Sequence, residues 1–361
     1  MLPFPNNIPP AKTPVRALTL AAHGGLDRLE LRSDLPVPDL QSSTDVRVRI
    51  MAGALNRLDL FVVEGLPGVT ITPPWIMGGD GAGVIDAVGD DAGGLEAGDR
   101  VIINPGISDR SCEYCRDGEQ SLCISYKLLG EHLPGTFAEY IVVPAANVRV
   151  IPDSIPWDQA AAYTLATITA WRMLVTRAMV REGEDVLIWG VGGGVASMAL
   201  LIAKLHGARV WVTSGSDFKL ERARELGADV TLNHDQVDVG REVRARTGKR
   251  GVDVVIDNVG QATWAQSLMA LGKRGRLVTC GATSGPMVQT DARRLFWNQW
   301  SILGSTMGND REMDAITRAL SSGALVAPVD SIFDLDHGRA AFDRLASGEQ
   351  FGKIVIRVHH D

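Results

Sequence analysis

The stretch Asp185–Lys204, DVLIWGVGGGVASMALLIAK, decides the fold of this chain. Its first residues are a short apolar run of the kind that forms a buried strand, and its second half has the apolar spacing of a helix. Between them stand Gly190, Gly192, Gly193 and Gly194. Glycine lets a backbone turn tightly and approach a pyrophosphate, whose charge is then held by amide N–H groups at the helix N-terminus. The stretch therefore predicts a strand–loop–helix unit that binds a dinucleotide.

Around this unit, short apolar runs alternate with helical segments. Strands are expected over residues 208–214, 251–259 and 275–281, and helices over 158–178, 194–207, 217–227 and 263–272. This alternation predicts a parallel, doubly wound α/β sheet with right-handed crossovers. Ala196 replaces the last glycine of the usual fingerprint, at a position that serves helix packing. A strand–helix turn without a ligand is the alternative reading of the loop.

Before Trp157 the pattern is one of short strands and turns, with strands expected over 45–55 and 137–151. The final stretch 351–358, FGKIVIRV, is another strand and is expected to return to this β-rich part. The expected organisation is an N-terminal arm over 1–14, a β-rich domain over 15–156 and 299–361, and a dinucleotide-binding domain over 157–298.

The composition excludes several classes of partner. The chain has 361 residues, 45% of them hydrophobic, which is enough for two packed cores. Its formal net charge is −7 and no Lys/Arg-rich run occurs, so neither a nucleic-acid partner nor a membrane partner is expected. No apolar run approaches the length of a spanning helix, and the first residues lack a secretory pattern. We expect a cytoplasmic protein that binds a small molecule.

The residues after the second strand of the unit bear on the choice of coenzyme. An NAD-binding unit places an acid there to hold the ribose hydroxyls, but this chain has Ser214 and Ser216. Lys219 and Arg222 follow in the first turns of the next helix, where the helix dipole disfavours cations. A bound 2′-phosphate would explain them, so the pattern favours NADP(H). In the alternative, Ser216 is a helix cap and Lys219 a solvated side chain.

Three of the four cysteines lie close together in SDRSCEYCRDGEQSLC, residues 108–123. Cys112, Cys115 and Cys123 are separated by steps of three and eight, and Asp109 precedes the first by three. In a reducing compartment such a cluster is more typical of a metal site than of disulfides. Cys280 is expected to be a packed strand residue.

Eight segments, taken in order, resemble the medium-chain zinc-type alcohol dehydrogenases, and more closely their NADPH-dependent quinone oxidoreductase branch. They are GDRVIINPG, CEYCRDGEQSLC, GTFAEYIVVP, TAWRML, the glycine loop, GADVTLNH, GVDVVIDNVG and FGKIVI. The resemblance covers nearly the whole chain after the arm. It implies a GroES-like catalytic domain, a Rossmann domain and an active site in the cleft between them.

The resemblance also locates the family's catalytic zinc ligands, and here those positions hold Asn56, Gly79 and Leu165. These three residues cannot form a tetrahedral zinc site with an open water position, so no catalytic zinc is expected. The family's structural zinc is bound by four cysteines, whose positions here are Asp109, Cys112, Cys115 and Cys123. Carboxylate is an accepted zinc donor, so one structural zinc is expected. The alternative is a lobe that has lost its metal.

Without a catalytic zinc, alcohol–ketone interconversion needs another group to stabilise the alkoxide. Hydride addition to a conjugated carbonyl or quinone spreads the charge instead, so we expect an NADPH-dependent reductase of quinones or α,β-unsaturated carbonyls. The alternatives are an NADP-dependent alcohol or aldehyde oxidoreductase and a non-enzymatic NADPH-binding redox sensor.

The candidates for assisting the reaction are Asn56, Asp59, Asp80 and Tyr163. The Asn56 amide can donate to a substrate oxygen. Asp59 and Asp80 match the acids that surround the zinc in the family, and each can serve either to orient neighbouring groups or to transfer a proton. Tyr163 is a candidate proton donor, with a buried packing tyrosine as the alternative. Phe61 stands where some quinone reductases carry a tyrosine, which weakens the transfer of their proton donor.

Further coenzyme contacts are expected from Thr169, Val195, Asn258, Gly281, Ala282 and Thr306. Thr169 corresponds to a threonine that contacts the nicotinamide in relatives. The segment 301–308, SILGSTMG, reads as the last strand of the dinucleotide domain and offers an edge for pairing across a two-fold axis. A homodimer, or a dimer of dimers, is therefore expected.

Overall fold

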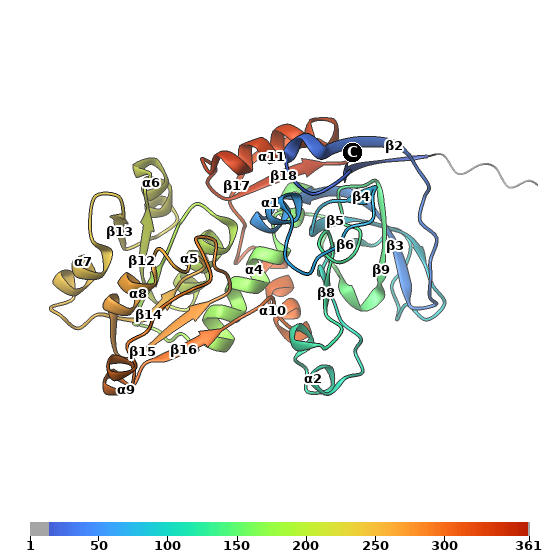
Figure 1. The fold of residues 1–361 in the computed structure, drawn as a ribbon. Coiled ribbons are helices and arrows are strands. Elements are labelled where there is room, and N and C mark those ends of the chain that lie inside the picture. Colours follow the sequence, from blue (N-terminus) through green and yellow to red (C-terminus); the bar gives the residue numbers. More distant parts are fainter. Residues whose placement is uncertain (1–13, 360–361) are drawn as a thin grey trace, which may run out of the picture.

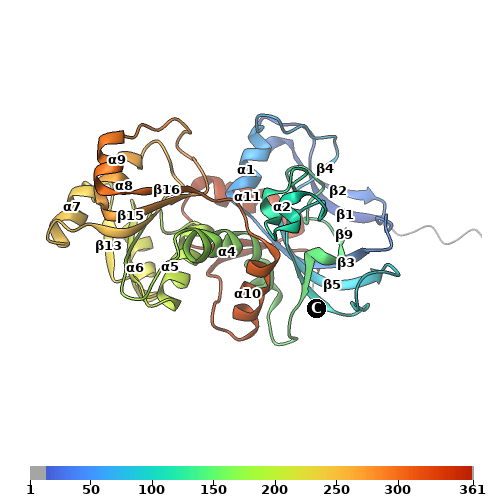
Figure 2. The same ribbon diagram turned by 90° about the horizontal axis from the view of Figure 1, so that it is seen from below.

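The computed structural model describes residues 14–359 of the 361-residue chain. Residues 1–13 of the predicted arm, and residues 360 and 361, lie outside the described residues. The chain forms a β-rich domain and an α/β domain that lie side by side (Figure 1). The view from below shows helices α4 (Thr164–Trp171) and α10 (Asp310–Ser321) between the two (Figure 2).

The α/β domain is built on one parallel sheet in the order β13-β12-β11-β14-β15-β16. Its strands are β11 (Asp185–Ile188), β12 (Arg209–Ser214), β13 (Val230–Asn233), β14 (Val252–Ile256), β15 (Leu271–Thr279) and β16 (Ser301–Gly304). Its helices are α5 (Gly194–Leu205), α6 (Asp217–Glu225), α7 (Val239–Arg246), α8 (Trp264–Ala270) and α9 (Ala292–Asn298). The strand order reverses between β11 and β14, which opens a crevice at the carboxyl ends of these strands.

The central strands β11, β12 and β14 are mostly apolar because both faces of the sheet are covered there. Successive side chains point to opposite faces, so Val186 and Ile188 enter the core under α4 and α5. Leu187 enters a second core together with Trp211 and Val255. The predicted doubly wound sheet is confirmed.

The last strand of the parallel sheet lies within the segment predicted for it. β16 pairs with β15 over Ser301–Gly304, inside the predicted strand 301–308, although the predicted domain boundary at residue 298 leaves this strand outside the domain. β15 begins earlier than predicted, at Leu271, directly after α8. Arg274, with φ of 60°, and a register shift opposite Val252 and Val254 accommodate this extension.

The helix predicted over 158–178 is interrupted. It consists of α3 (Trp157–Ala161), α4, and a π-helical turn over Arg172–Arg177. A new helix begins at Thr164 because the Asp80 carboxylate lies at this point. Asp80 Oδ1 accepts hydrogen bonds from the Thr164 hydroxyl at 2.6 Å and from the Leu165 N–H at 2.7 Å. A negative charge is stabilising at a helix N-terminus, where N–H groups have no partner within the helix.

The β-rich domain contains a seven-stranded sheet with the order β10-β6-β5-β3-β18-β17, in which β9 also pairs with β3. These strands are β3 (Asp45–Ala54), β5 (Asp80–Val88), β6 (Arg100–Ile103), β9 (Tyr140–Pro144), β10 (Val148–Val150), β17 (Val329–Asp334) and β18 (Lys353–Arg357). Smaller sheets are formed by β1 (Val15–Leu20), β2 (Leu29–Leu35) and β4 (Trp75–Ile76), and by β7 (Gly106–Ile107) and β8 (Lys127–Leu128). The remaining helices are α1 (Arg57–Glu64), α2 (Glu113–Arg116) and α11 (Gly338–Ser347).

One buried core joins the two domains. It contains Ala54 of β3, Val355 of β18, Ala166 of α4, and Val186 and Met198 of the α/β domain. Elements of the two domains therefore pack directly against each other. Among the described residues, every helix falls short of the length and apolar character that a membrane crossing requires.

Candidate functional site

The glycine loop lies between β11 and α5, at the crevice. Gly190 and Gly192 have φ of 69° and 132°, which side-chain-bearing residues rarely adopt. A Cβ at Gly190 or Gly193 would have open space around it, whereas one at Gly194 would lie 2.8 Å from Cδ of Lys353. The loop therefore leaves its backbone accessible at the N-terminus of a twelve-residue helix. This geometry fits a pyrophosphate, and Val195 lies in the first turn of the same helix.

The residues predicted to choose the coenzyme lie together beyond β12. The Ser216 N–H donates to Ser214 Oγ at 3.1 Å, and Ser216 Oγ accepts from the Lys219 N–H as the cap of α6. The Lys219 side chain lies against Gly192, and its Nζ donates to the carbonyl of Gly348. Burial lowers the pKa of Lys219 below its usual range, with a smaller contribution from nearby Arg344. Lys219 is thus a half-buried cation beside the glycine loop.

An acid missed by the sequence analysis stands at the same place. A Cβ at Gly215 would collide with the Asp235 carboxylate, which comes from the turn after β13. Asp235 is mostly exposed, so its oxygens face solvent beside the end of β12. The sequence pattern places the ribose-binding acid at the end of the second strand, and Asp235 reaches that neighbourhood from the third.

The further predicted coenzyme contacts lie after the carboxyl ends of β14, β15 and β16 and, with Thr169, on α4. A Cβ at Gly281 would lie 3.3 Å from the Asn258 carbonyl oxygen, and Ala282 packs against Gly260. The Thr169 hydroxyl donates to the carbonyl of Leu165 at 2.7 Å and lies 3.7 Å from Met307 Sδ. Thr306 is the exposed residue just before Met307.

Four polar side chains form a buried cluster beneath this cleft, which we call the lysine cluster: Asn56, Asp59, Asp80 and Lys353. Lys353 Nζ donates to Asn56 Oδ1 at 2.5 Å and to Asp80 Oδ2 at 2.8 Å. Asn56 Nδ2 donates to Asp80 Oδ2 at 2.9 Å, and the Asn56 N–H donates to Asp59 Oδ2 at 2.7 Å. The side chains of Lys353 and Asp80 are 2% and 0% exposed. The structure therefore brings three of the four predicted catalytic residues together around a lysine.

The orientation of the Asn56 amide limits what it can do. One amide hydrogen goes to Asp80, and Nδ2 lies 3.4 Å from the carbonyl oxygen of Ala54. Lys353 has three N–H groups, and its bonds to Asn56 and Asp80 use two of them. In this arrangement the third N–H group of Lys353 is the donor in the lysine cluster that could still bind a substrate oxygen.

Asp59 is the titratable group of the cluster near neutrality. Burial raises the pKa of Asp59 to about 7, although hydrogen bonds from the N–H groups of Asn56 and Gly78 and the charge of Lys353 oppose this rise. Asp59 is the third residue of α1, and its carboxyl group completes a capping box with Asn56. A group of this kind can exchange a proton around pH 7.

The three positions that the resemblance assigns to a catalytic zinc do converge, but their chemistry does not fit a metal. Asn56 belongs to the lysine cluster, and a Cβ at Gly79 would lie 3.2 Å from Cδ1 of Leu165. An amide already bonded to an ammonium group, a glycine and a leucine supply no tetrahedral donor set. The ammonium group of Lys353 lies beside this position instead.

Tyr163 lies elsewhere. Its side chain is fully buried and its hydroxyl donates to the carbonyl of Ile316 in α10 at 2.9 Å. Burial raises the pKa of Tyr163 above its usual range. The structure thus separates Tyr163 from the lysine cluster and gives its hydroxyl a structural partner.

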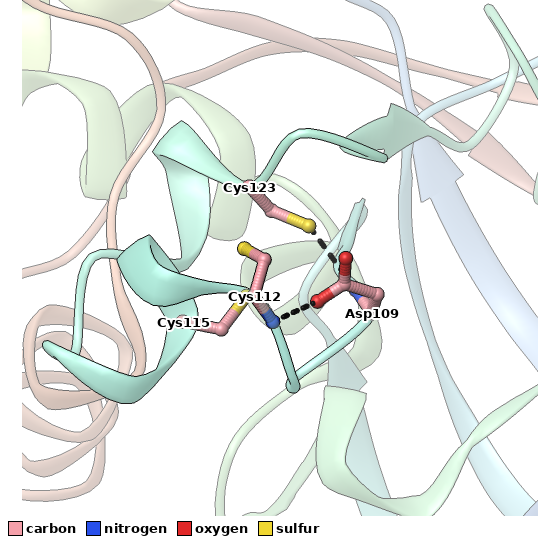
Figure 3. Close-up of side chains that lie close together, drawn as sticks. All are labelled: Asp109, Cys112, Cys115 and Cys123. Atoms are coloured by element: carbon pink, nitrogen blue, oxygen red, sulfur yellow. Dashed lines mark hydrogen bonds between the residues drawn. The ribbon is translucent and has the colours of Figure 1, made fainter.

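The second site is the lobe that contains α2, which we call the metal lobe (residues 109–123). One ligand atom from each of Asp109, Cys112, Cys115 and Cys123 lies within 4.8 Å of the others (Figure 3). Asp109 Oδ1 accepts hydrogen bonds from the Ser111 and Cys112 N–H groups at 2.8 and 2.9 Å. These bonds, that from Cys112 above all, hold the pKa of Asp109 below its usual range, while burial raises the pKa of Cys115 to about 12. One oriented carboxylate and three converging thiols fit a tetrahedral zinc ion, which deprotonates the thiols it binds.

Comparisons with known proteins agree with this geometry. Residues 42–153 match the family model of the alcohol dehydrogenase GroES-like domain, and residues 194–322 match that of the zinc-binding dehydrogenases. An NAD-dependent alcohol dehydrogenase of Sulfolobus acidocaldarius is 30% identical, over 95% of this chain and all of the relative. The quinone oxidoreductase of Homo sapiens is 26% identical, over 95% of this chain and 97% of the relative. The crystal structure of an NAD-dependent alcohol dehydrogenase superposes with a TM-score of 0.90 at 42% identity, over 95% of this chain and all of that one.

Proposed function

This chain belongs to the zinc-type alcohol dehydrogenase-like superfamily, and from that premise we propose that it reduces quinones or α,β-unsaturated carbonyls without a catalytic zinc. The single observation that carries the proposal is the lysine cluster. A buried ammonium group, held by Asn56 and Asp80, lies where the resemblance puts the metal. Membership of the superfamily makes the chain an oxidoreductase, whereas the substrate class is our inference.

The cluster suits a reaction in which charge develops on a delocalised oxygen. A nicotinamide coenzyme, when bound, would supply the hydride, whose addition to a conjugated system would leave an enolate or a hydroquinone anion. Lys353 offers a positive charge and one uncommitted N–H to that oxygen, in surroundings from which water is largely excluded. Asp80 holds the ammonium group in place, and Asp59 can exchange a proton near neutral pH.

Substrate panels test this proposal. Purified protein is assayed with aryl quinones, with enones, and with simple alcohols and aldehydes, using both phosphorylated and unphosphorylated coenzymes. We expect kcat/KM for quinones or enones to exceed that for alcohols by at least about a hundredfold. Faster turnover of alcohols would reject the proposal, and tight coenzyme binding without turnover on any substrate would favour a non-enzymatic redox sensor.

For the coenzyme we propose NADP(H). The end of β12 carries Ser214 and Ser216 in place of an acid, and the Lys219 cation lies half-buried beside the glycine loop. Lys219 must leave the Gly348 carbonyl to meet a 2′-phosphate, a rotation that its long side chain permits.

NAD(H) is a second candidate, and one observation favours it. The Asp235 carboxylate lies beside Gly215, where it can accept hydrogen bonds from ribose hydroxyls and would repel a phosphate. Several relatives are described as NAD-dependent. Fluorescence titration with NADPH and NADH decides between the two: we expect tighter binding of NADPH, and its preference should grow in Asp235→Asn and shrink in Lys219→Gln. Tighter binding of NADH by the unmodified protein would reject NADP(H).

We also propose that two copies associate through β16. It is the edge strand of the parallel sheet, and Phe296 and Trp297 of the neighbouring α9 are 67% and 77% exposed. A free strand edge next to exposed aromatic side chains is typical of a surface that pairs with another chain.

A further inference from the structure

A buried arginine connects the metal lobe to the first turn of α10. Arg172, the first residue of the π-helical turn, forms ion pairs with Glu119 of the metal lobe and with Glu312 of α10. Its Nη1 lies 3.0 Å from Glu312 Oε2, and Nη2 donates to Glu119 Oε2. The side chains of Arg172 and Glu312 are 5% and 6% exposed. Glu119 stands between Cys115 and Cys123 in the chain, so its position depends on how the metal lobe is folded.

Glu312 holds the segment that follows β16, residues 305–309. Its Oε2 accepts from the Asn309 N–H at 2.7 Å, and its own N–H donates to Asn309 Oδ1 at 2.9 Å, which closes a capping box at the start of α10. Gly308 is wedged between Ile168 of α4 and the Glu312 carboxylate, with no room for a Cβ. The position of residues 305–309 is therefore fixed by the same carboxylate that binds Arg172.

This segment contains Thr306, and its next residue, Met307, contacts Thr169. Both threonines are predicted coenzyme contacts, and Thr169 is the one that the resemblance places at the nicotinamide. A continuous chain of contacts thus runs from the metal lobe through Glu119, Arg172 and Glu312 to the coenzyme cleft.

A second set of contacts fixes the metal lobe to the first turn of α10. Arg110, next to Asp109, forms two hydrogen bonds with the Asp310 carboxylate, at 2.8 and 3.2 Å. The Asp310 N–H donates to Gln120 Oε1 at 3.3 Å. Figures 1 and 2 both show α2 of the lobe close to α10. The metal lobe is therefore hydrogen-bonded to the first residue of α10, next to the capping box formed by Asn309 and Glu312.

We propose that Arg172 is a positioning residue that transmits the folded state of the metal lobe to residues 305–309, so that coenzyme affinity depends on the metal although no metal ligand lines the cleft. A buried arginine that loses one of its two carboxylate partners must move or draw the other partner toward it. Because Glu312 also forms the capping box, either response disturbs the segment before α10. The inference rests on the proposed function only in assuming that a nicotinamide coenzyme binds in this cleft.

The test compares two substitutions within the same lobe. Glu119→Gln removes the charge that faces Arg172, and Glu113→Gln is the matched control, because Glu113 is exposed on α2 and makes no hydrogen bond across to α10 through its side chain. Coenzyme dissociation constants are measured by fluorescence for each protein, as purified with its zinc and after zinc removal with a chelator. We expect Glu119→Gln to weaken binding about tenfold and Glu113→Gln to leave it unchanged.

Zinc removal provides the decisive comparison. In the unmodified protein and in Glu113→Gln, it should weaken coenzyme binding by a similar factor. In Glu119→Gln, zinc removal should weaken coenzyme binding little further, because the contact between Glu119 and Arg172 is already lost. Unchanged affinity in Glu119→Gln, or an equal effect of zinc removal in all three proteins, overturns the inference. If Glu119→Gln does not retain zinc, Arg172→Lys, which keeps the charge but not the two-sided contact, replaces it in the same comparison.

Hydrogen exchange separates this inference from the proposed function. Amides of residues 305–313 should exchange faster in Glu119→Gln and in zinc-free protein, with or without coenzyme. If the unmodified protein binds neither NADPH nor NADH, the proposed function fails while the exchange result still decides the connection. Unchanged exchange over these residues contradicts the connection.

Discussion

Asp59 gives the folded protein a specific pH dependence. Its pKa is raised to about 7 in the fold, whereas an unfolded aspartate titrates near 4, so the folded state binds more protons in between. Stability from this group is therefore complete at low pH and falls as the pH rises from about 4 to 7. Asp59→Asn removes the titration while keeping a side-chain carbonyl as an acceptor.

We expect the stability of Asp59→Asn relative to the unmodified protein to rise between pH 5 and pH 7, by about 1 kcal/mol per pH unit. Denaturant unfolding at several pH values measures this difference. A difference that stays flat, or that falls with pH, would show that Asp59 is already ionised in the fold.

Lys353 should matter for stability and for chemistry in separable ways. Lys353→Met leaves the buried Asp80 carboxylate without its cation, which costs about 3 to 5 kcal/mol. Combining it with Asp80→Asn removes both charges, and most of that loss should be recovered. Both proteins lack Lys353, the proposed donor to the substrate oxygen. In each of them kcat/KM for enones or quinones should therefore be about a hundredfold lower than in the unmodified protein.

Unfolding curves and steady-state kinetics on the two proteins check this. Recovery of both stability and activity in the double substitution would show that Lys353 is only structural. A double substitution as unstable as Lys353→Met alone would contradict the account of the cluster.

The predicted coenzyme and metal residues rest on local sequence patterns, whereas no such pattern indicates Lys353 or Asp235. Lys353 meets Asn56 across 297 residues, and the stretch FGKIVI reads only as a strand. A lysine at the start of an apolar, buried strand is the one signal that would have indicated it, since buried lysines need a partner. The Asp235 carboxylate lies next to Gly215 because of where the turn after β13 is placed in the fold, and no local sequence pattern indicates this placement.

The glycine loop allows stability and coenzyme binding to be tested apart. Gly193 has an ordinary φ of −82° and open space where a Cβ would be, so Gly193→Ala should cost the fold only about 1 kcal/mol or less, as the cap of α5. If the pyrophosphate approaches the loop there, the methyl group should raise the coenzyme dissociation constant at least about tenfold.

Fluorescence titration and thermal unfolding of this variant measure the two effects. As a control, Gly183→Ala lies in a turn far from the loop, with φ of 77° and open space around its Cβ, and should lower stability without changing affinity. Unchanged coenzyme binding in Gly193→Ala would show that the pyrophosphate does not lie on this loop.

The proposed zinc site of the metal lobe has the Asp109 carboxylate as its fourth candidate ligand. Metal analysis of protein purified without added zinc should give about one zinc per chain, Asp109→Cys should retain it, and Asp109→Ala should lose most of it. Zinc content near zero in the unmodified protein would show an empty lobe. Equal zinc in Asp109→Ala would show that Asp109 is not a ligand.

At the scale of elements, the central strands β11, β12 and β14 are predictable because each contains an apolar run next to a helical segment, whereas the short strand β13, VTLN, is not among the predicted strands. The interruption at Ala162 and Tyr163 is not predictable, because its cause is the Asp80 carboxylate, 84 residues before Thr164. The early start of β15 likewise depends on a bulge opposite β14. Local sequence specifies the type of element here, and long-range polar contacts set where it begins and ends.

At the scale of the whole molecule, the proposed dimer places Trp297 in a subunit interface. Trp297→Glu adds a charge to a side chain that is 77% exposed in the single chain, so the fold should tolerate it. We expect light scattering coupled to gel filtration to show a dimer for the unmodified protein and a monomer for this variant. Val150→Glu, another exposed apolar site in the β-rich domain, is the control and should stay dimeric. A monomeric unmodified protein would exclude the interface.

The position of β18 has a consequence for biosynthesis. It is the last strand to leave the ribosome among the described elements, yet it lies inside the β-rich sheet between β3 and β17. Until it arrives, β3 has a free edge at Ala52, Gly53 and Ala54, Asn56 and Asp80 lack their cation, and Gly194 lacks the side chain that packs on it. The nascent chain should therefore expose an incomplete sheet until Lys353 has left the ribosome, and the site should form only after that point. Proteolysis of ribosome-bound chains halted before and after Lys353 leaves the exit tunnel would detect that late closure.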